Sequence, residues 1–204
     1  MVKTSHLSYQ YPESEIISFP DISSLKGETL LICGASGCGK TTLLQLLSGL
    51  RKPTNGSVTI GDVDVSGLSS TQLDQYRGKH IGIVYQQSYF IQSISVLDNL
   101  LVSPYAEGKL KAESISERLG ISSQLKKYAH QLSIGQQQRA SIARAVMNDP
   151  KLILADEPTS ALDDKSCSQV IQLLKEEAKL NEATLIIVTH DNRLKSEFKN
   201  VVDL

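Results

Sequence analysis

Long hydrophobic runs are missing from this sequence, so no segment is predicted to cross a lipid bilayer. The longest apolar runs are residues 30–33 and 185–188, whereas a transmembrane helix needs about 20 apolar residues. The first six residues also lack the apolar core of a secretory signal peptide. We therefore expect a chain that is neither inserted in a membrane nor secreted.

An excess of charge of one sign is missing as well. The 21 Lys and Arg residues nearly balance the 22 Asp and Glu residues, which gives a formal net charge of −1 at pH 7. This balance excludes the broad positive surface that attracts nucleic acid or an anionic membrane, so no nucleic-acid partner is expected. Cysteine is scarce, because Cys33, Cys38 and Cys167 are an odd number without metal-ligand spacing. Reduced thiols in a cytoplasmic protein are the simplest account of them.

A glycine-rich phosphate loop is present. Residues 34–41 read Gly-Ala-Ser-Gly-Cys-Gly-Lys-Thr and match the pattern G-x-x-x-x-G-K-[ST]. The apolar run 29–33 before the loop predicts a buried strand, and residues 40–47 after it predict a helix. This arrangement gathers backbone N–H groups and a helix N-terminus around phosphates. Lys40 is expected to reach the β- and γ-phosphates and Thr41 to bind Mg²⁺. The residues predicted to contact a nucleoside triphosphate here are Gly34, Ala35, Ser36, Gly37, Cys38, Gly39, Lys40, Thr41 and Thr42.

Strand and helix patterns alternate along the rest of the chain. Helical patterns dominate the middle third, which suggests a helical lobe inserted in an α/β sheet. In the helix predicted over 164–180, one apolar face carries five residues, namely Cys167, Val170, Ile171, Leu174 and Ala178. The predicted strands are 7–11, 16–19, 57–60, 81–85, 152–156 and 184–189, with 201–204 closing the sheet. The other predicted helices are 96–102, 111–119 and 134–147.

Two carboxylates end the predicted strand 152–156. An acidic residue at the carboxyl end of a strand beside a phosphate loop suits a Mg²⁺ site, because this ion prefers oxygen ligands. Asp156 is expected to contact the metal directly or through water. Glu157 points elsewhere and is expected to polarise an attacking water. Together with the phosphate loop, this pair favours hydrolysis over binding alone.

A short signature lies between these motifs, at residues 132–139, Leu-Ser-Ile-Gly-Gln-Gln-Gln-Arg. Locally, Ser133 and Gln136 form an S-x-x-Q capping box at the start of a helix. The octet also resembles the signature of ABC-type ATPases, usually written Leu-Ser-Gly-Gly-Gln. Ile134 stands where glycine is commonest, and the first position of a helix tolerates it. Four further matches follow the family order and extend the resemblance over essentially the whole chain: Tyr11 (adenine-stacking aromatic), Gln86 (Q-loop), residues 160–163 (D-loop) and His190 (switch histidine).

The resemblance implies a single domain over residues 1–204 with a P-loop NTPase core. Such a core has a mainly parallel sheet, an N-terminal antiparallel β subdomain and a helical subdomain inserted at about 87–150. The resemblance also implies ATP and Mg²⁺ as ligands, with Gln86 beside Asp156 and Thr41 at the metal. Glu157, His190 and Gln86 would carry the catalytic roles.

The same resemblance implies partners. Two copies would pair head-to-tail and trap ATP, so that the signature residues of one copy reach the γ-phosphate held by the other. An integral membrane permease would be a further partner, which places the chain on the inner face of the cell membrane. Tyr89 and Phe90, next to the Q-loop, would either line the groove for that permease or belong to the core of the helical lobe. The signature residues expected to act in this way are Ser133, Gly135 and Gln136.

The branch of the family is indicated by residues 76–86 together with 96–100. These segments are similar to the lipoprotein-releasing and macrolide-export branch, although amino-acid importers share much of the pattern. The competing class is a soluble ABC-type ATPase that acts on DNA or ribosomes, and a degenerate regulatory module is a third alternative. Intact Asp156, Glu157 and His190 argue against the degenerate module.

Overall fold

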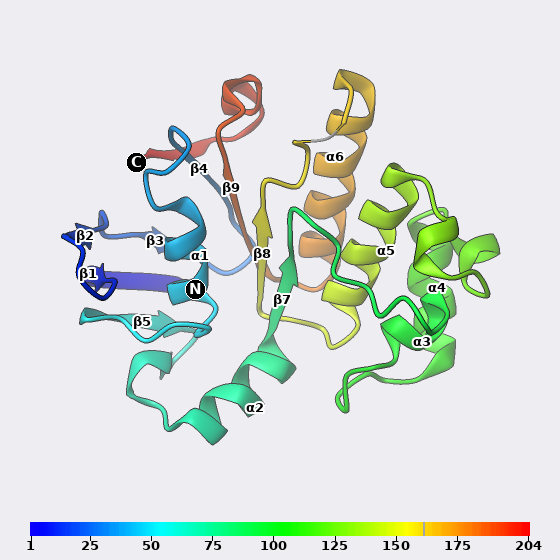
Figure 1. The fold of residues 1–204 in the computed structure, drawn as a ribbon, viewed down its shortest axis with the longest axis horizontal. Coiled ribbons are helices and arrows are strands. Elements are labelled where there is room, and N and C mark those ends of the chain that lie inside the picture. The colour runs from blue at the N-terminus through cyan, green and yellow to red at the C-terminus, as the bar shows by residue number, and fades with distance from the viewer. Residues whose placement is uncertain (161) are drawn as a thin grey trace.

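The computed structural model describes residues 1–160 and 162–204 and shows two β-sheets with helices around them (Figure 1). One is a five-stranded sheet in the order β10-β4-β9-β8-β7, and all of its pairs are parallel. Its central strands are buried on both faces, which explains why they read as continuous apolar runs. The strands are β4 (Thr29–Cys33), β7 (Ile81–Val84), β8 (Leu152–Asp156), β9 (Thr184–Thr189) and β10 (Asn200–Asp203).

The second sheet is antiparallel and is built from the first part of the chain. In β1, buried residues such as Val2 and Thr4 alternate with more exposed ones. The expected start of this strand at Leu7 is wrong. In its first half, apolar and polar residues alternate, so no apolar run marks it in the sequence. The strands of the antiparallel sheet are β1 (Val2–Gln10), β2 (Ile16–Ser18), β3 (Ser23–Ser24), β5 (Asn55–Ile60) and β6 (Val63–Asp64).

Helices separate and cover these sheets. Figure 1 shows α1 between the two sheets, α5 and α6 on the opposite side of the parallel sheet, and α3 and α4 beyond α5. We propose that α3–α5, together with the loops that join them, form the inserted subdomain expected at 87–150. The helices are α1 (Lys40–Leu47), α2 (Ser70–His80), α3 (Val96–Leu100), α4 (Lys109–Arg118), α5 (Ile134–Val146) and α6 (Asp164–Leu180). Short 3₁₀ turns occupy η1 (Val65–Gly67), η2 (Ser122–Gln124), η3 (Ala129–Gln131) and η4 (Asn192–Glu197).

The register of the parallel sheet divides the core in two. In β8, Leu152 and Leu154 pack into the cluster around α1, whereas Ile153 and Ala155 pack into the cluster that contains α5 and α6. Successive side chains of a strand point to opposite faces, so a slip by one residue would exchange the two sets.

Several expected elements have the bounds that the sequence predicts. Strands 29–33, 152–156 and 184–189 and helices 40–47 and 164–180 are confirmed, and β10 closes the sheet edge beside β4. All five residues of the predicted apolar face of α6 are buried.

Other expected bounds are wrong, mostly by one or two residues. For example, α3 ends at Leu100 rather than 102, and α4 begins at Lys109 rather than 111. Helix α2 was not predicted at all, since Leu73 is its one buried side chain and no apolar stripe marks it. The capping box of Ser69 and Gln72 was the available signal.

An ion pair joins α4 to α6. Arg118 donates from Nε and Nη2 to the two carboxylate oxygens of Glu177, at 3.0 and 2.9 Å. Glu177 is buried, and the hydrogen bonds to its carboxylate raise the pKa of the Arg118 guanidinium above its ordinary value. The pair therefore fixes the outer helix against the core by a bidentate contact.

Removing one partner of this pair should destabilise the fold. Arg118→Ala leaves the buried Glu177 carboxylate uncompensated, so urea unfolding should show a loss of about 2 kcal/mol, discounted because Arg118 is partly exposed. Replacing both residues by Met should recover most of that loss. The exposed pair Lys26–Glu182 is the control, and Lys26→Ala should change the unfolding free energy by less than about 0.5 kcal/mol. Equal losses in the single and double variants would contradict the assignment.

Candidate active site

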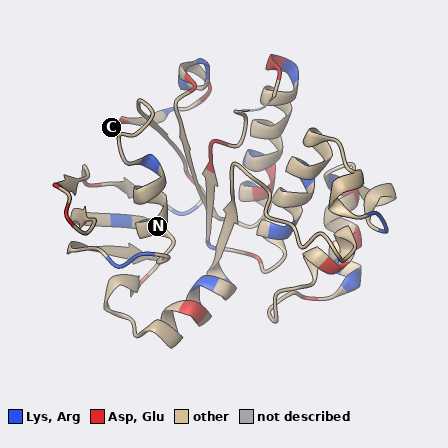
Figure 2. Cartoon of the chain, in the orientation of Figure 1, with Lys and Arg blue, Asp and Glu red and all other residues tan. Residues whose placement is uncertain are grey.

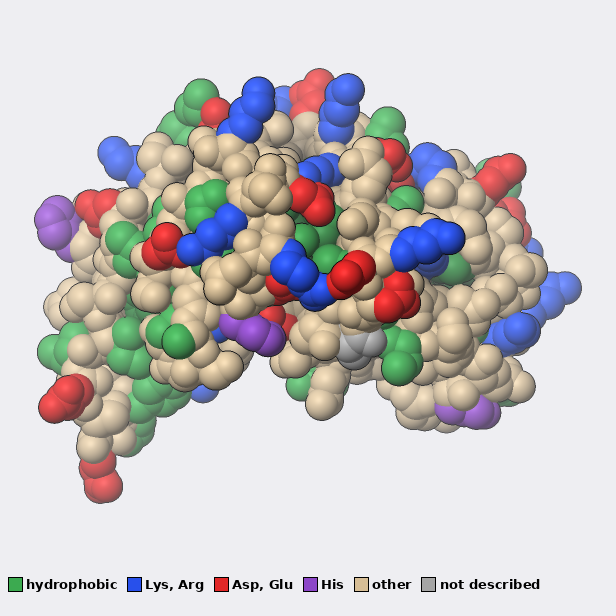
Figure 3. Space-filling model, turned by 90° about the horizontal axis from the view of Figure 1, so that it is seen from above, with side chains coloured by type: hydrophobic (Ala, Val, Ile, Leu, Met, Phe, Trp, Pro, Cys, Tyr) green, Lys and Arg blue, Asp and Glu red, His purple; other side chains and the backbone are tan. Residues whose placement is uncertain are grey.

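The carboxyl ends of four parallel strands meet at one edge of the sheet. The phosphate loop leaves β4, Asp156 ends β8 with Glu157 next in the chain, His190 follows β9, and Gln86 lies just beyond β7. Parallel strands bring such groups together because their carboxyl ends share an edge. Figure 3 looks onto this edge and shows Lys and Arg side chains interspersed with Asp and Glu side chains.

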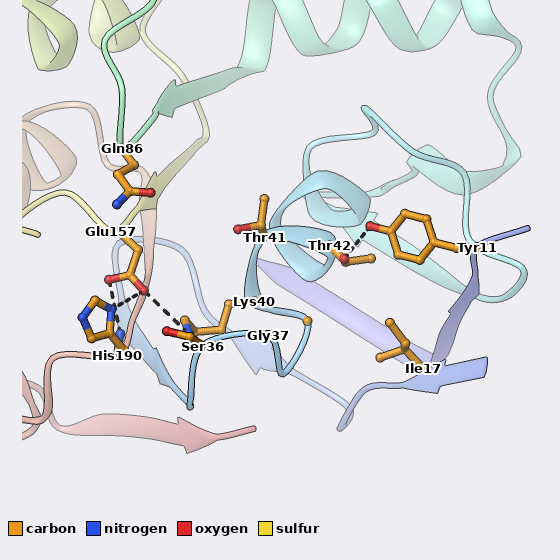
Figure 4. A pocket seen from close by; sticks show the side chains of 11 residues that line it. Tyr11, Ile17, Ser36, Gly37, Lys40, Thr41, Thr42, Gln86, Glu157 and His190 are labelled. Atoms are coloured by element: carbon orange, nitrogen blue, oxygen red, sulfur yellow. Dashed lines mark hydrogen bonds and ion pairs between the residues drawn. The ribbon is translucent and has the colours of Figure 1, made fainter. Parts of the chain in front are cut away.

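A cavity of about 440 Å³ lies at this edge (Figure 4). Its size is typical of a site for a small ligand. The structure brings most of the predicted nucleotide residues into it, from both sheets and from α1. The cavity is lined by Tyr11, Ile17, Ser36, Gly37, Gly39, Lys40, Thr41, Thr42, Gln86, Glu157 and His190.

The phosphate loop depends on its glycines. Gly37 and Gly39 have φ of 84° and 103°, a left-handed conformation that favours glycine. At Gly34 the reason is space, because a Cβ there would lie 2.5 Å from the Sγ of Cys38. Gly39 is the N-cap of α1, so the loop leads directly into the positive end of that helix.

Lys40 is buried at the floor of the cavity. Its ammonium donates hydrogen bonds to the carbonyl oxygens of Gly34 and Ala35, at 2.8 and 2.9 Å. It also lies 3.6 Å from Oε1 of Glu157. An anionic ligand in the cavity would therefore meet a cation already held in place by the loop.

Asp156 offers an unused oxygen beside the loop. Its Oδ2 accepts a hydrogen bond from the hydroxyl of Thr41 at 3.2 Å, whereas Oδ1 is buried and has no hydrogen-bond partner. Burial raises the pKa of this carboxyl above its ordinary value. Asp156 does not line the main cavity but a neighbouring one, which Thr41 and Gln86 share. A buried oxygen without a partner is costly unless a cation or water occupies the site.

Glu157 is held by three polar contacts. Its Oε2 accepts from the hydroxyl of Thr189 at 2.9 Å and from the backbone N–H of His190 at 3.2 Å. Its Oε1 lies 2.9 Å from Nδ1 of His190. The backbone at Glu157 has a φ of 46°, a left-handed conformation that costs free energy in a residue other than glycine. The carboxylate is thus fixed at the mouth of the loop, next to Lys40 (Figure 4).

Gln86 faces the loop that follows β8. Its amide donates to the hydroxyl of Ser160 at 3.2 Å. The predicted D-loop at residues 160–163 includes Ala161, which lies outside the described residues. Asp163 is the N-cap of α6 and accepts a hydrogen bond from the backbone N–H of Ser166 at 3.0 Å.

Tyr11 lines the end of the cavity opposite Glu157 (Figure 4). Its hydroxyl lies 2.8 Å from that of Thr42 on α1. Ile17 lines the same end, although the only signal for it in the sequence is an apolar residue on a short strand. Thr189, the partner of Glu157, likewise carries no motif that marks it as a site residue.

The signature residues lie away from the cavity. Ser133 caps α5, where its hydroxyl accepts from the backbone N–H of Gln136 at 3.3 Å and its own N–H donates to the Gln136 side chain at 3.1 Å. A Cβ at Gly135 would meet open space, and the Ile134 side chain is 62% exposed. Ser133, Gly135 and Gln136 do not line the chain's own cavity. Their predicted contact with nucleotide therefore requires a second copy.

Tyr89 and Phe90 lie in different surroundings. Phe90 is buried in the core, and the Arg144 guanidinium lies 4.8 Å from its ring centre. Of the two alternatives, Phe90 therefore belongs to the core and not to a docking groove. Tyr89 is 68% exposed and packs edge-on against Tyr85, with ring centres 5.5 Å apart. Tyr89 alone remains available to a partner.

Comparison with known proteins decides the family. The sequence profile of the ABC transporter family matches residues 21–160. The chain belongs to this family. It is similar to the lipoprotein-releasing system ATP-binding protein LolD of Shewanella frigidimarina (strain NCIMB 400), with 35% identity over 207 residues that cover 97% of this chain and 87% of that protein. It is also similar to the macrolide export ATP-binding/permease protein MacB of Burkholderia pseudomallei (strain 1710b), with 36% identity over 214 residues, or 100% of this chain and 33% of that protein.

A solved ABC cassette shares the whole fold. The dimeric post-hydrolysis state of the ATP-binding cassette MJ0796, bound to ADP and Pi, superposes with a TM-score of 0.88 at 32% identity, over 100% of this chain and 94% of that chain. The predicted fold class and the predicted branch of the ABC transporter family are confirmed. These relatives give no support to the alternatives of an amino-acid importer or an ATPase that acts on DNA or ribosomes.

Neutralising Asp156 should stabilise the free protein in a pH-dependent way. Burial raises the pKa of Asp156, so the folded protein holds this proton more tightly than the unfolded chain does. The ionised carboxylate therefore costs stability at pH 7, and the cost vanishes below the unfolded pKa of about 3.9. Asp156→Asn should raise the urea midpoint at pH 7 in EDTA, and the gain should shrink as the pH falls toward 4. A variant that is less stable than the wild type at pH 7 would contradict this.

Proposed function

We propose that this chain hydrolyses Mg²⁺-bound ATP in the cavity at the strand ends and couples hydrolysis to a separate membrane permease. As a member of the ABC transporter family, the chain is an ATP-binding and ATP-hydrolysing subunit of a transporter. The roles of individual residues, the metal and the location in the cell belong to the proposal.

One observation carries the assignment of the site. The cavity has an aromatic end at Tyr11 and a carboxylate end at Glu157, with the glycine loop and Lys40 between them. This order matches the order of base, phosphates and attacking water in a nucleoside triphosphate. Stacking on Tyr11 suits the base, and the loop N–H groups and Lys40 suit the phosphates.

The residues beside the loop fit Mg²⁺. Thr41 and Asp156 provide two oxygens, and Oδ1 of Asp156 has no hydrogen-bond partner, so it is available to coordinate a cation. Gln86 adds an amide oxygen at the neighbouring cavity. Mg²⁺ usually takes one or two protein ligands and keeps its remaining waters. When bound, the ion would neutralise charge on the β- and γ-phosphates.

The chain's own groups then perform three tasks. Lys40 exchanges its bonds to the loop carbonyls for charge-assisted bonds to phosphate oxygens. Glu157 orients the attacking water and accepts its proton, because its carboxylate is fixed by Thr189 and His190 at the phosphate end. His190 contacts the γ-phosphate from the same side.

The chain pairs with a second copy of itself, as its family and the dimeric cassette indicate. We propose that ATP drives this pairing. Ser133, Gly135 and Gln136 of one copy would then present the N-terminus of α5 to the γ-phosphate held by the other copy. A helix of 13 residues directs the positive end of its dipole toward such an anion, and Ser133 stands at its N-cap.

A membrane permease is the second partner. Among the described residues, no helix is long and apolar enough to cross a membrane. We propose that the permease docks in a groove of about 790 Å³ between α2, β7 and α5, whose lining includes Tyr85, Tyr89, Tyr105 and Arg144. This would place the chain on the cytoplasmic face of the membrane. Charges of both signs are scattered over the elements (Figure 2), so we propose no nucleic-acid partner.

Glu157→Gln tests the catalytic site and the dimer together. The amide keeps the shape of the side chain but loses the ability to accept a proton, so turnover should fall by about 10²- to 10⁴-fold while ATP binding remains. The variant should accumulate as a dimer with Mg·ATP in sedimentation, and adding Ser133→Arg should prevent this. Glu176→Gln, an exposed carboxylate on α6, is the control. Near-normal hydrolysis in Glu157→Gln would remove Glu157 from the role.

Tyr89→Ser and Phe90→Ser should behave differently. Tyr89 is exposed, so its replacement should leave the fold and the basal ATPase unchanged but reduce co-purification with a co-expressed permease. Phe90→Ser should instead lower the unfolding free energy by about 3–5 kcal/mol, because it leaves a cavity in the core. A folded Tyr89→Ser variant that binds the permease normally would place the docking surface elsewhere.

A further inference from the structure

Arg51, just beyond α1, lies against the two tyrosines at the base end of the cavity. Its guanidinium carbon is 4.9 Å from the ring centre of Tyr11 and 5.3 Å from that of Tyr9. Nη1 donates to the hydroxyl of Tyr9 at 2.9 Å, and Nε donates to Oε1 of Gln45 at 2.6 Å. No carboxylate among the described residues forms an ion pair with Arg51. The cation is therefore held by tyrosine rings and neutral acceptors.

The same contacts restrict Tyr11 from several directions. Its hydroxyl is bonded to Thr42 on α1, and its ring meets that of Tyr9 edge-on, with centres 4.8 Å apart and an interplanar angle of 84°. Tyr11 lines the cavity, whereas Arg51 and Tyr9 do not. The guanidinium thus lies against the Tyr11 ring without itself lining the cavity.

We propose that Arg51 is a positioning residue for the nucleotide base, acting through Tyr11. A cation on one face of the Tyr11 ring holds the ring in the orientation that presents its other face to the base. A ring ordered in advance lowers the entropy cost of binding. The inference rests on the proposed function, since it requires that the base stacks on Tyr11.

This role predicts which ligands are affected. Arg51 has no contact with the phosphate loop among the described residues. Its loss should therefore lower the affinity for ligands that carry a base and leave the affinity for a bare polyphosphate unchanged. Stacking uses the π-face that every base has, so the affinities for ATP and GTP should fall by similar factors. Turnover at saturating ATP should not change, because Lys40 and Glu157 are not touched.

The experiment measures the dissociation constants of Mg·ADP and Mg·tripolyphosphate by calorimetry on the whole chain. Arg51→Met keeps an unbranched apolar stem but removes the guanidinium, and with it the charge and the hydrogen bonds to Tyr9 and Gln45. It should weaken ADP by about 3- to 10-fold, which corresponds to a lost cation–π contact, and leave tripolyphosphate within 2-fold. The KM for ATP should rise by a similar factor with kcat unchanged. Arg51→Lys should recover part of the loss, because it restores a cation over the ring.

Two further variants distinguish failure of the proposed role of Arg51 from failure of the proposed base site at Tyr11. Lys52→Ala removes the exposed neighbouring cation and should leave ADP affinity unchanged. Tyr11→Ala should weaken ADP at least as much as Arg51→Met does. If Tyr11→Ala weakens ADP and Arg51→Met does not, the role of Arg51 is overturned while the proposed site stands. If neither variant weakens ADP, base stacking on Tyr11 itself is wrong. If Arg51→Met weakens tripolyphosphate equally, Arg51 acts on the phosphate loop and the inference fails.

Discussion

The parallel pairing of β4, β9 and β8 decides where the reactive groups of this chain lie. In this register Cys33 lies opposite Thr189, and Asp156 lies opposite Val188. The backbone N–H of Glu157 adds one more bond, to the carbonyl of Val188 at 2.9 Å, before the chain turns away. A shift of β8 by two residues would move its end by about 7 Å. Glu157 would then lose its contacts with both Thr189 and His190. The register of the sheet therefore determines the geometry of the proposed catalytic site.

Unfavourable local features gather at this same edge. Glu157 has a left-handed backbone, Asp156 has a buried oxygen without a partner, and Lys40 is a buried cation bonded to carbonyls. The left-handed backbone and the unpaired oxygen cost stability in the free protein, and all three groups are positioned to be relieved or used by a bound phosphate or cation. The fully buried strands on either side hold these groups in place.

The elements that the sequence predicts are those whose burial leaves a recognisable pattern of apolar residues. Strands buried on both faces appear as apolar runs, so β4, β8 and β9 were predicted with their bounds, and the glycine loop carries its own pattern. The polar helix α2 and the first half of β1 leave no such mark. The contact of Arg51 with Tyr11 depends on how β1 packs against α1, and two neighbours, Tyr89 and Phe90, proved to face different surroundings. Local periodicity does not encode such tertiary contacts.

The first turn of α1 joins the two sheets at the site. Lys40 lies against Glu157, Thr41 bonds to Asp156, and the next residue, Thr42, bonds to Tyr11. Three consecutive side chains thus connect the parallel sheet, which carries the proposed hydrolytic groups, to the antiparallel sheet, which carries the proposed base site. A nucleotide bound as proposed would span the same two sheets and add a second connection parallel to α1. In the proposed function, hydrolysis would change the contacts at Lys40 and Thr41 and leave the contact between Thr42 and Tyr11 intact. The base end would then retain the product while the phosphate end is released.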